Sequence, residues 1–190
     1  DAYREPLQAS REQFLSTLGI PSGKRYVLYS PLGDRIVKVG ERIVPNTFDR
    51  DAIVLMLKHL PRDYVLLIRL PPTDTVTLQN VENDPRLIID RPGERFGEGA
   101  KAIRMTELSP ADDRRLVASI VYSDAVFTVF SSIAVDALYL NKPVVLFGFD
   151  PTPVSYWESV SRIHEFEHLQ PLRRSKAVFT AKNEMDLKHF

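Results

Sequence analysis

Two adjacent serines, Ser131 and Ser132, suit anion binding because they follow a short apolar run at a point where a helix would begin. The first N–H groups of a helix have no acceptor within the helix, and they lie at the positive end of its dipole. With two hydroxyls beside them, they would converge on a phosphate or a diphosphate. Asp136 follows about one helical turn later, where its carboxylate can accept hydrogen bonds from a ribose. The structural alternative makes Ser131 an ordinary helix cap and Asp136 a solvated helix residue.

The loop at residues 30–35 is a second candidate binding segment. Gly33 would let the backbone approach a ligand closely, and Arg35 is a candidate partner for a phosphate. The same Pro-x-Gly-Asp pattern is also typical of a plain turn. Spacing alone therefore leaves both interpretations of this loop open.

A third candidate is a literal H-E-x-x-H, formed by His164, Glu165 and His168. On one continuous helix the two imidazoles would share a face and bind zinc, with Glu165 as general base. Pro171 follows closely, which favours an ordinary amphipathic helix after the last apolar run. The inward face of that helix would consist of Trp157, Val160, Ile163 and Phe166. A further interpretation places one of these histidines at the binding cleft.

The elements that must position these residues alternate between strand and helix. Five nearly continuous apolar runs, at residues 26–29, 64–68, 87–89, 125–130 and 143–149, are typical of strands buried on both faces. Helical patterns lie between them, one of them opened by Ser109 and Pro110, and a short lead-in helix precedes Gly19. We therefore predict an α/β fold, a doubly wound Rossmann-like parallel sheet.

Such a sheet binds ligands at the carboxyl ends of its strands, where the strand order reverses. In a doubly wound order the first and fourth strands flank that crevice. The two loops predicted to meet there are residues 30–35 and 129–132.

Composition excludes several classes of function. The chain has 190 residues, 44% hydrophobic and 26% charged, which suits one globular domain of 1–190 rather than a disordered chain or a coiled coil. Lys and Arg total 25 and Asp and Glu total 25, so the basic excess that is usual in a nucleic-acid binder is missing and we expect no nucleic-acid partner. There is no cysteine, hence neither a disulfide framework nor a thiolate metal site.

Residues 122–138 (YSDAVFTVFSSIAVDAL) and 141–150 (NKPVVLFGFD) resemble the carboxy-terminal half of the CDP-glycerol glycerophosphotransferase family. Residues 14–21 and 24–31 (FLSTLGIP and KRYVLYSP) are similar to the start of the donor-binding domain of that family, and residues 63–69 to one of its strands. The wider GT-B glycosyltransferases and the UDP-N-acetylglucosamine 2-epimerases share a looser version of the pattern. The resemblance covers about residues 10–150 and implies a GT-B C-terminal-type domain.

The resemblance implies roles for individual residues. Ser131 and Ser132 would bind the donor phosphates, and Asp136 would hold the ribose or shape the pocket. Arg69 would lie near the diphosphate, and Thr106 would line the nucleotide site. Residues 31–35 would close over the donor. No metal and no separate cofactor are implied, since the CDP- or UDP-linked donor is the substrate.

Two departures from the family pattern concern its chemistry. No histidine stands near Pro71, where the family has His-Pro, and Val129 and Phe130 replace its Asp and Tyr. The sequence therefore assigns no catalytic residue. Either a missing amino-terminal half supplies the acceptor chemistry, or this chain uses another donor, or its activity is lost.

The resemblance implies the donor-nucleotide-binding half of a GT-B-type transferase. The transferase would move a sugar or polyol phosphate from a nucleotide-activated donor to a teichoic-acid-like or other cell-surface polysaccharide acceptor. The alternatives are a non-catalytic nucleotide-sugar-binding module and an enzyme like UDP-N-acetylglucosamine 2-epimerase. The chain would be part of a two-domain protein and inactive without its amino-terminal acceptor domain.

Three further expectations concern the two ends of the chain, membrane-spanning helices and the cellular location. Residues 1–20 would carry the lead-in helix, and residues 151–190 would form a helical segment after the sheet. No run of about 18 apolar residues is present, so no membrane-spanning helix is expected. The implied location is cytoplasmic, with peripheral association of the full-length protein at the inner face of the membrane.

Overall fold

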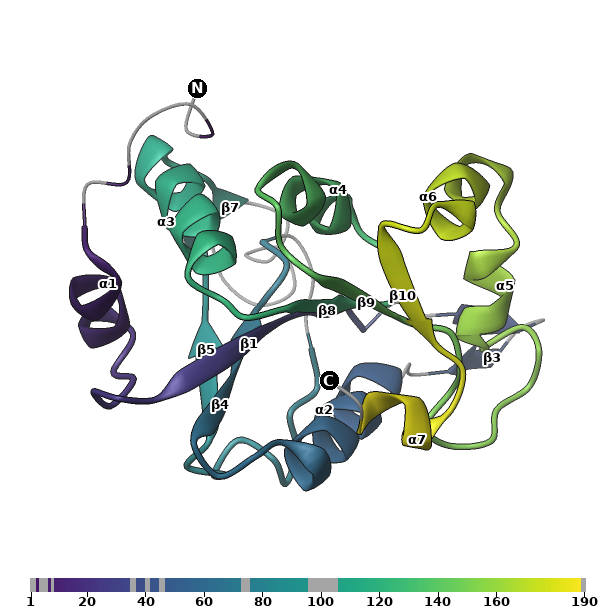
Figure 1. The fold of residues 1–190 in the computed structure, drawn as a ribbon. Helices are drawn as coiled ribbons and strands as arrows, with labels where there is room; N and C mark the ends of the chain where they lie inside the picture. The colour runs from purple at the N-terminus through teal and green to yellow at the C-terminus, as the bar shows by residue number, and fades with distance from the viewer. Residues whose placement is uncertain are drawn as a thin grey trace.

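A six-stranded parallel sheet with helices on both faces dominates the structure, which is a computed structural model (Figure 1). The structure describes residues 9–34, 37–39, 42–44, 47–72, 76–95 and 106–188, together with Tyr3 and Leu7. In spatial order the strands are β10 (Val178–Ala181), β9 (Val144–Phe147), β8 (Val126–Thr128), β1 (Arg25–Ser30), β4 (Tyr64–Arg69) and β5 (Leu87–Asp90). All neighbouring pairs in this sheet are parallel.

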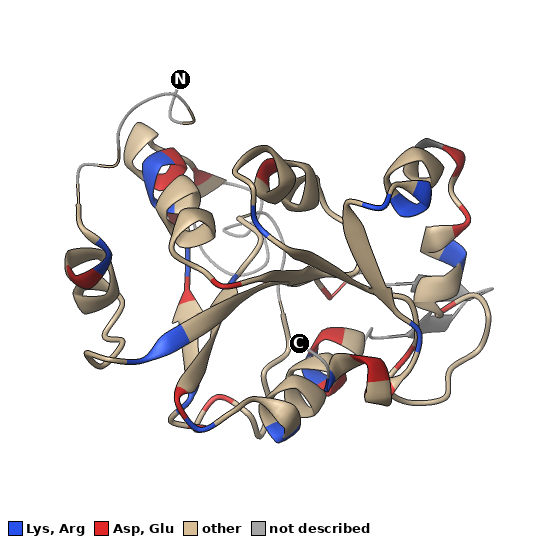
Figure 2. Cartoon of the chain, viewed as in Figure 1, with Lys and Arg blue, Asp and Glu red and all other residues tan. Residues whose placement is uncertain are grey.

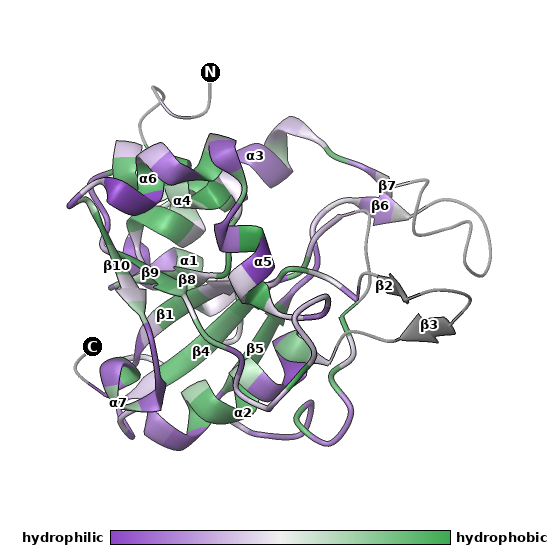
Figure 3. Cartoon of the chain, turned by 90° about the vertical axis from the view of Figure 1, so that its right-hand side faces the viewer, coloured by the Kyte–Doolittle hydropathy of each residue, from purple (hydrophilic) through white to green (hydrophobic). Residues whose placement is uncertain are grey.

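Two short antiparallel ribbons lie outside the main sheet. They are β2 (Val37–Val39) with β3 (Arg42–Val44), and β6 (Glu94–Arg95) with β7 (Thr106–Glu107). Figure 3 shows the β6–β7 ribbon beyond one end of the sheet. Each ribbon follows a strand of the main sheet in the sequence, β1 for the first and β5 for the second.

The strands consist of continuous apolar runs because helices cover the sheet on both faces. Figure 3 shows the apolar character of the strands by their hydrophobic colour. In β1, Tyr26 and Leu28 pack into the core on one face, and Val27 and Tyr29 into the core on the other. Successive side chains of a strand point to opposite faces, so a strand between two helix layers needs apolar residues at every position. Figure 2 accordingly shows the acidic and basic residues mainly on the outer helices and loops.

The helices divide between the two faces of the sheet (Figure 1). One face carries α1 (Arg11–Thr17), α3 (Pro110–Val121), α4 (Ser132–Tyr139) and α6 (Gln170–Arg174). The other face carries α2 (Phe48–His59) and α7 (Glu184–Leu187). Between β9 and α6 lie α5 (Val160–His164) and the 3₁₀ helix η2 (Glu167–Leu169).

The predicted fold class is confirmed, and the five expected strands are five of the six strands of the sheet. The N-cap of α3 is also as predicted. The Ser109 hydroxyl accepts a hydrogen bond from the Asp112 N–H, and the Asp112 side chain accepts from the Ser109 N–H to complete a capping box. The lead-in helix is α1, which has its own capping box at Ser10.

The expectation for residues 151–190 was wrong in two respects. The segment is not only helical, because β10 pairs with β9 and extends the sheet at its edge. The expected inward face is also only half correct. Val160 is buried, but Trp157 and Phe166 are 59% and 43% exposed. The helix pattern fails because α5 ends at His164 and its successors are separate short turns.

The strand order places the reversal of the chain between β1 and β8. From β1 the chain runs outward through β4 and β5, then returns to the other side of β1 and continues through β8, β9 and β10. The first and fourth expected strands are therefore neighbours, as predicted. Among the described residues, no helix combines the length and the apolar character that crossing a membrane requires.

Candidate functional site

A cavity of about 290 Å³ opens at the carboxyl ends of the central strands, where the strand order reverses. Its walls come from the end of β1, the segment after β4, the outer side of α3 and the start of α4. Four of the predicted site residues line it together: Arg69, Ser131, Ser132 and Asp136. The topology thus brings side chains from distant parts of the sequence to one wall.

The start of α4 is the part of this wall that is best suited to an anion. Ser131 has the extended backbone of an N-cap residue, with φ of −150° and ψ of 155°, yet its hydroxyl makes no capping hydrogen bond. The N-cap serines of α1, α3 and α5 all accept such a bond. The first turn of α4 also contains no acidic residue. The free N–H groups of the first turn and the Ser131 hydroxyl are therefore available to a ligand.

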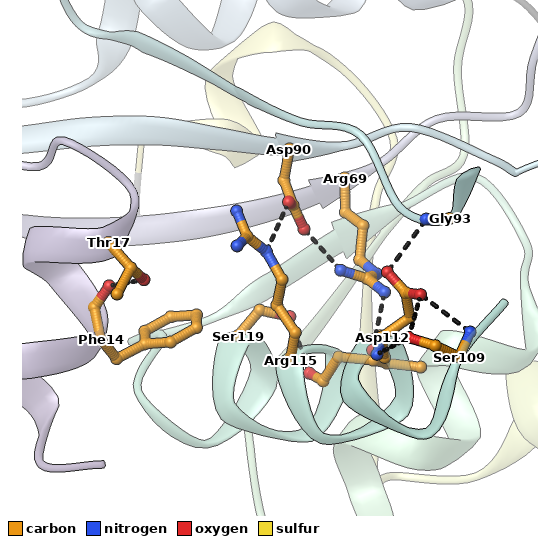
Figure 4. Close-up of polar contacts among 10 residues, drawn as sticks. Phe14, Thr17, Arg69, Asp90, Gly93, Ser109, Asp112, Arg115 and Ser119 are labelled. Carbon is orange, nitrogen blue, oxygen red and sulfur yellow. Dashed lines mark hydrogen bonds and ion pairs between the residues drawn. The ribbon is translucent and has the colours of Figure 1, made fainter. Parts of the chain in front are cut away.

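Arg69 provides a cation to the same cavity. It is the last residue of β4, and its side chain is only 8% exposed. Its Nη1 donates to Asp90 Oδ2, and its Nη2 donates to the Asp112 carbonyl oxygen at 3.0 Å (Figure 4). The N–H groups of Ser109 and Gly93 donate to the Asp112 carboxylate and hold the pKa of Asp112 below its usual value. Asp112 therefore connects Arg69, which it binds through its carbonyl oxygen, with Gly93 in the segment after β5, which it binds through its carboxylate.

Asp136 supplies a hydrogen-bond acceptor one helical turn from Ser132. Burial raises the pKa of this carboxyl, and a hydrogen bond from the Tyr3 hydroxyl partly opposes that effect. Burial and the Asp136 carboxylate in turn raise the pKa of Tyr3 to about 12. The Tyr3 ring also packs edge-to-face on Tyr139 of α4, with the centroids 6.0 Å apart. A ligand hydroxyl that binds Asp136 would therefore have to share it with Tyr3 or displace Tyr3.

Asp49, which we did not anticipate, fixes the loop after β1. Its carboxylate is 1% exposed and accepts hydrogen bonds from the Tyr29 hydroxyl, the Leu32 N–H at 2.9 Å and the Gly33 N–H at 2.8 Å. Burial raises the pKa of this carboxyl. Because Leu32 lines the cavity, Asp49 shapes the cavity wall without reaching the cavity itself.

Two of the remaining predicted site residues, Gly33 and Thr106, are not among the residues that line the cavity. Gly33 is not among the residues lining the cavity; its φ of 93° explains the glycine, and its N–H is committed to Asp49. Thr106 pairs with Arg95 in the short ribbon and is likewise not among the lining residues. Arg35 lies outside the described residues. Their predicted roles in binding stay predictions.

The H-E-x-x-H motif does not lie on one helix. After His164 the chain leaves α5, and Phe166 has an extended backbone with φ of −59° and ψ of 130°. The His164 imidazole is buried, with Nε2 donating to the Phe147 carbonyl oxygen and Nδ1 without a hydrogen-bond partner. Within the described part of the chain, no group of three His, Asp or Glu side chains could hold a metal ion. The helical geometry that the zinc hypothesis requires is therefore contradicted.

The buried His164 predicts a loss of stability in mild acid. Burial lowers its pKa below the ordinary value of 6.5, so the folded protein keeps the imidazole neutral while the unfolded chain takes up a proton. The free energy of unfolding should therefore fall as pH drops below about 6.5, by at most about 1.4 kcal/mol for each pH unit from this group. Urea unfolding between pH 5 and 8 measures the effect. His164→Gln should flatten this part of the profile, and an unchanged slope would contradict the assignment.

Solved structures with a similar fold were found, although no protein-family model and no curated protein matches the sequence. The wall teichoic acid polymerase TagF superposes with a TM-score of 0.54 and 19% identity over 94% of this chain and 37% of that chain. UDP-GlcNAc 2-epimerase from Neisseria meningitidis, bound to UDP-GlcNAc, gives 0.53 and 11% over 94% and 39%. The S. aureus MnaA–UDP structure gives 0.51 and 12% over 98% and 39%.

These matches identify the architecture. The chain has the Rossmann-like fold of a GT-B domain. It spans less than two-fifths of the length of each of these structures. Identities of 11% to 19% establish the fold alone, so the chemistry of this GT-B domain must be argued from its own cavity.

The two departures from the family pattern change the chemical groups that the cavity wall offers. Val129 is fully buried in the core beneath the sheet edge, so its side chain is not part of the cavity wall. Phe130 lines the cavity and makes this part of the wall apolar. Among the described residues, no histidine lines the cavity. The described part of the cavity wall therefore offers hydroxyls, one guanidinium and carboxylates, but no imidazole.

Sequence reasoning missed four other groups around the cavity, namely Asp113, Asp90, Arg115 and Tyr3. Asp113 lines it from α3, while Asp90 and Arg115 lie behind Arg69. A signal for Asp90 was present, because a charged residue directly follows both the second and the third expected strand, and the two charges have opposite signs. In a parallel pair the carboxyl ends meet, and Arg69 and Asp90 are register partners. No comparable signal exists for Tyr3.

Proposed function

We propose that this chain is the donor-nucleotide-binding domain of a GT-B-type transferase. The enzyme would move a sugar or polyol phosphate from a CDP- or UDP-linked donor to a teichoic-acid-like or other cell-surface polysaccharide acceptor. The observation that carries the proposal is the convergence of Arg69, Ser131, Ser132 and Asp136 on one cavity at the reversal of the strand order. The likeness in fold to TagF, to a UDP-GlcNAc 2-epimerase bound to UDP-GlcNAc and to the MnaA–UDP structure supports it.

The groups that line the cavity suit the two parts of a nucleoside diphosphate, the diphosphate and the ribose. The start of α4 and the Arg69 guanidinium would bind the diphosphate, because amide N–H groups, hydroxyls and a cation all favour negative charge. Asp113 and Asp136 accept hydrogen bonds and would face ribose hydroxyls. During transfer, charge grows on the leaving diphosphate, and preorganised donors at α4 would stabilise it.

A non-catalytic nucleotide-sugar-binding module is the second candidate. Two observations favour it. No histidine among the described residues lines the cavity, and Val129 is buried, so neither the segment around Pro71 nor position 129 offers a general base. An epimerase-like activity would need acid and base groups at the sugar, and Asp113 and Asp136 are the carboxyls available within the described cavity wall.

Calorimetry with CDP, UDP and GDP, each compared with its nucleoside, tests the binding function. We expect micromolar binding of at least one nucleoside diphosphate and much weaker binding of the matched nucleoside, because the phosphate contacts carry the affinity. Turnover of CDP-glycerol and UDP-GlcNAc by the full-length protein then separates the candidates. Binding with transfer supports the transferase, and binding without turnover supports the module. If no nucleotide binds, the proposed function is wrong.

A further inference from the structure

A buried carboxylate between two arginines lies directly behind the cavity. Asp90, the last residue of β5, is 1% exposed. Its Oδ2 accepts a hydrogen bond from Arg69 Nη1, and its Oδ1 accepts one from Arg115 Nε at 2.7 Å. Figure 4 shows the carboxylate between the two side chains. Each oxygen is bound to a different arginine, so the carboxylate cannot rotate without losing both contacts.

This arrangement fixes the orientation of the Arg69 guanidinium. Nη1 is held by Asp90 and Nη2 by the Asp112 carbonyl oxygen, which determines the plane of the group. A guanidinium has five N–H donors, and these two contacts use one donor from each Nη. Arg69 also lines the cavity, so its other donors are at hand for a ligand oxygen.

Stability alone is a weak reason for this cluster. Burying two charges costs desolvation energy, and a well-packed apolar pair in the same place is often as stable as an ion pair. Asp90 and Arg69 are register partners at the edge of a sheet whose other positions are mostly apolar. A fixed guanidinium, in contrast, binds phosphate with less loss of side-chain freedom than a mobile one.

We propose that Asp90, supported by Arg115, is a positioning residue that holds Arg69 for the phosphates of the bound nucleotide. The inference rests on the proposed function and adds to it the device that orients the anion-binding cation. Asp90 itself does not contact the ligand. Its removal should therefore lower the contribution of the phosphates to affinity and leave the contribution of the nucleoside unchanged.

Calorimetry of the chain with CDP, cytidine, UDP and uridine tests this. Asp90→Asn should weaken binding of the diphosphates at least tenfold while changing nucleoside affinity less than twofold. Arg115→Gln should weaken diphosphate binding about threefold, because Asp90 then keeps only one of its two anchors. Asp84→Asn is the matched control. It breaks the Arg86–Asp84 ion pair, at 3.1 Å, before the same strand and away from the cavity, and should leave both affinities unchanged.

The outcomes separate this inference from the proposed function. If the unaltered chain binds nucleoside diphosphates and Asp90→Asn binds them equally well, positioning by Asp90 is refuted and the function stands. Equal losses for nucleosides and diphosphates would show a merely structural role. If Asp90→Asn does not fold, Arg115→Gln decides the question, since the Arg115 side chain is 38% exposed and tolerates change. Absence of all nucleotide binding in the unaltered chain refutes the proposed function instead.

Discussion

Ser132→Glu should weaken binding of nucleoside diphosphates about 100-fold without harming the fold. Ser132 is exposed, lines the cavity and begins α4, whose first turn has no acidic residue. A carboxylate in the first turn interacts favourably with the helix dipole, by about 0.3–1 kcal/mol, so the free energy of unfolding should stay the same or rise. A diphosphate in the cavity would instead meet a negative charge within a few ångströms. At an effective dielectric constant of about 20, this repulsion and the lost contacts justify a loss of about 100-fold in affinity.

Val135→Glu is the matched control for this experiment. It places the same charge on the same helix, at a residue that is 57% exposed and not among those lining the cavity. Calorimetry with CDP and UDP should show near-normal affinity for Val135→Glu and an affinity about 100-fold lower for Ser132→Glu. Equal affinities for the two variants would mean that the start of α4 is not the diphosphate site.

Asp49→Ala should produce the largest loss of stability among the variants considered. The substitution leaves three donors without their buried acceptor, namely the Tyr29 hydroxyl and the N–H groups of Leu32 and Gly33. Each unsatisfied buried group costs about 1–3 kcal/mol, so the free energy of unfolding should fall by about 3 kcal/mol or more. In a domain of this size that corresponds to roughly 6–12 °C in Tm.

Chemical denaturation of Asp49→Ala and Asp63→Ala checks this expectation. Asp63 is exposed, so its substitution should change the free energy of unfolding by less than about 0.5 kcal/mol. Tyr29→Phe removes only one donor and should give an intermediate loss. A variant Asp49→Ala as stable as the unaltered chain would show that the carboxylate does not hold the loop after β1.

The sheet could be predicted because its signal is local. Strands such as β1 and β4 need apolar residues at nearly every position, and this pattern is visible within six residues. β10 escaped prediction because only Ala181 of its four residues is buried, whereas β5, the other edge strand, keeps two buried residues and a run of three apolar ones. An edge strand has one neighbour and a less complete cover, so its sequence carries less of the pattern.

The cavity could be predicted only in part, for a related reason. Ser131, Ser132 and Asp136 follow from the start of one helix, so they can be found from their immediate surroundings, whereas Arg69 was implied only by the family resemblance. Asp49 reads as an ordinary acidic residue in the first turn of α2. That it is buried depends on Tyr29 and the loop after it, 16 to 20 residues earlier in the chain. Such contacts exist only in the folded structure.

The uncapped start of α4 couples ligand occupancy to thermal stability. A serine hydroxyl that caps a helix contributes about 1 kcal/mol to the free energy of unfolding. The Ser131 hydroxyl makes no such hydrogen bond, although its backbone has the required conformation. An anion seated on the first turn would satisfy the same N–H groups and restore that contribution. The ligand-free domain would therefore melt at a lower temperature than the ligand-bound domain, and the melting temperature would rise with the concentration of the ligand.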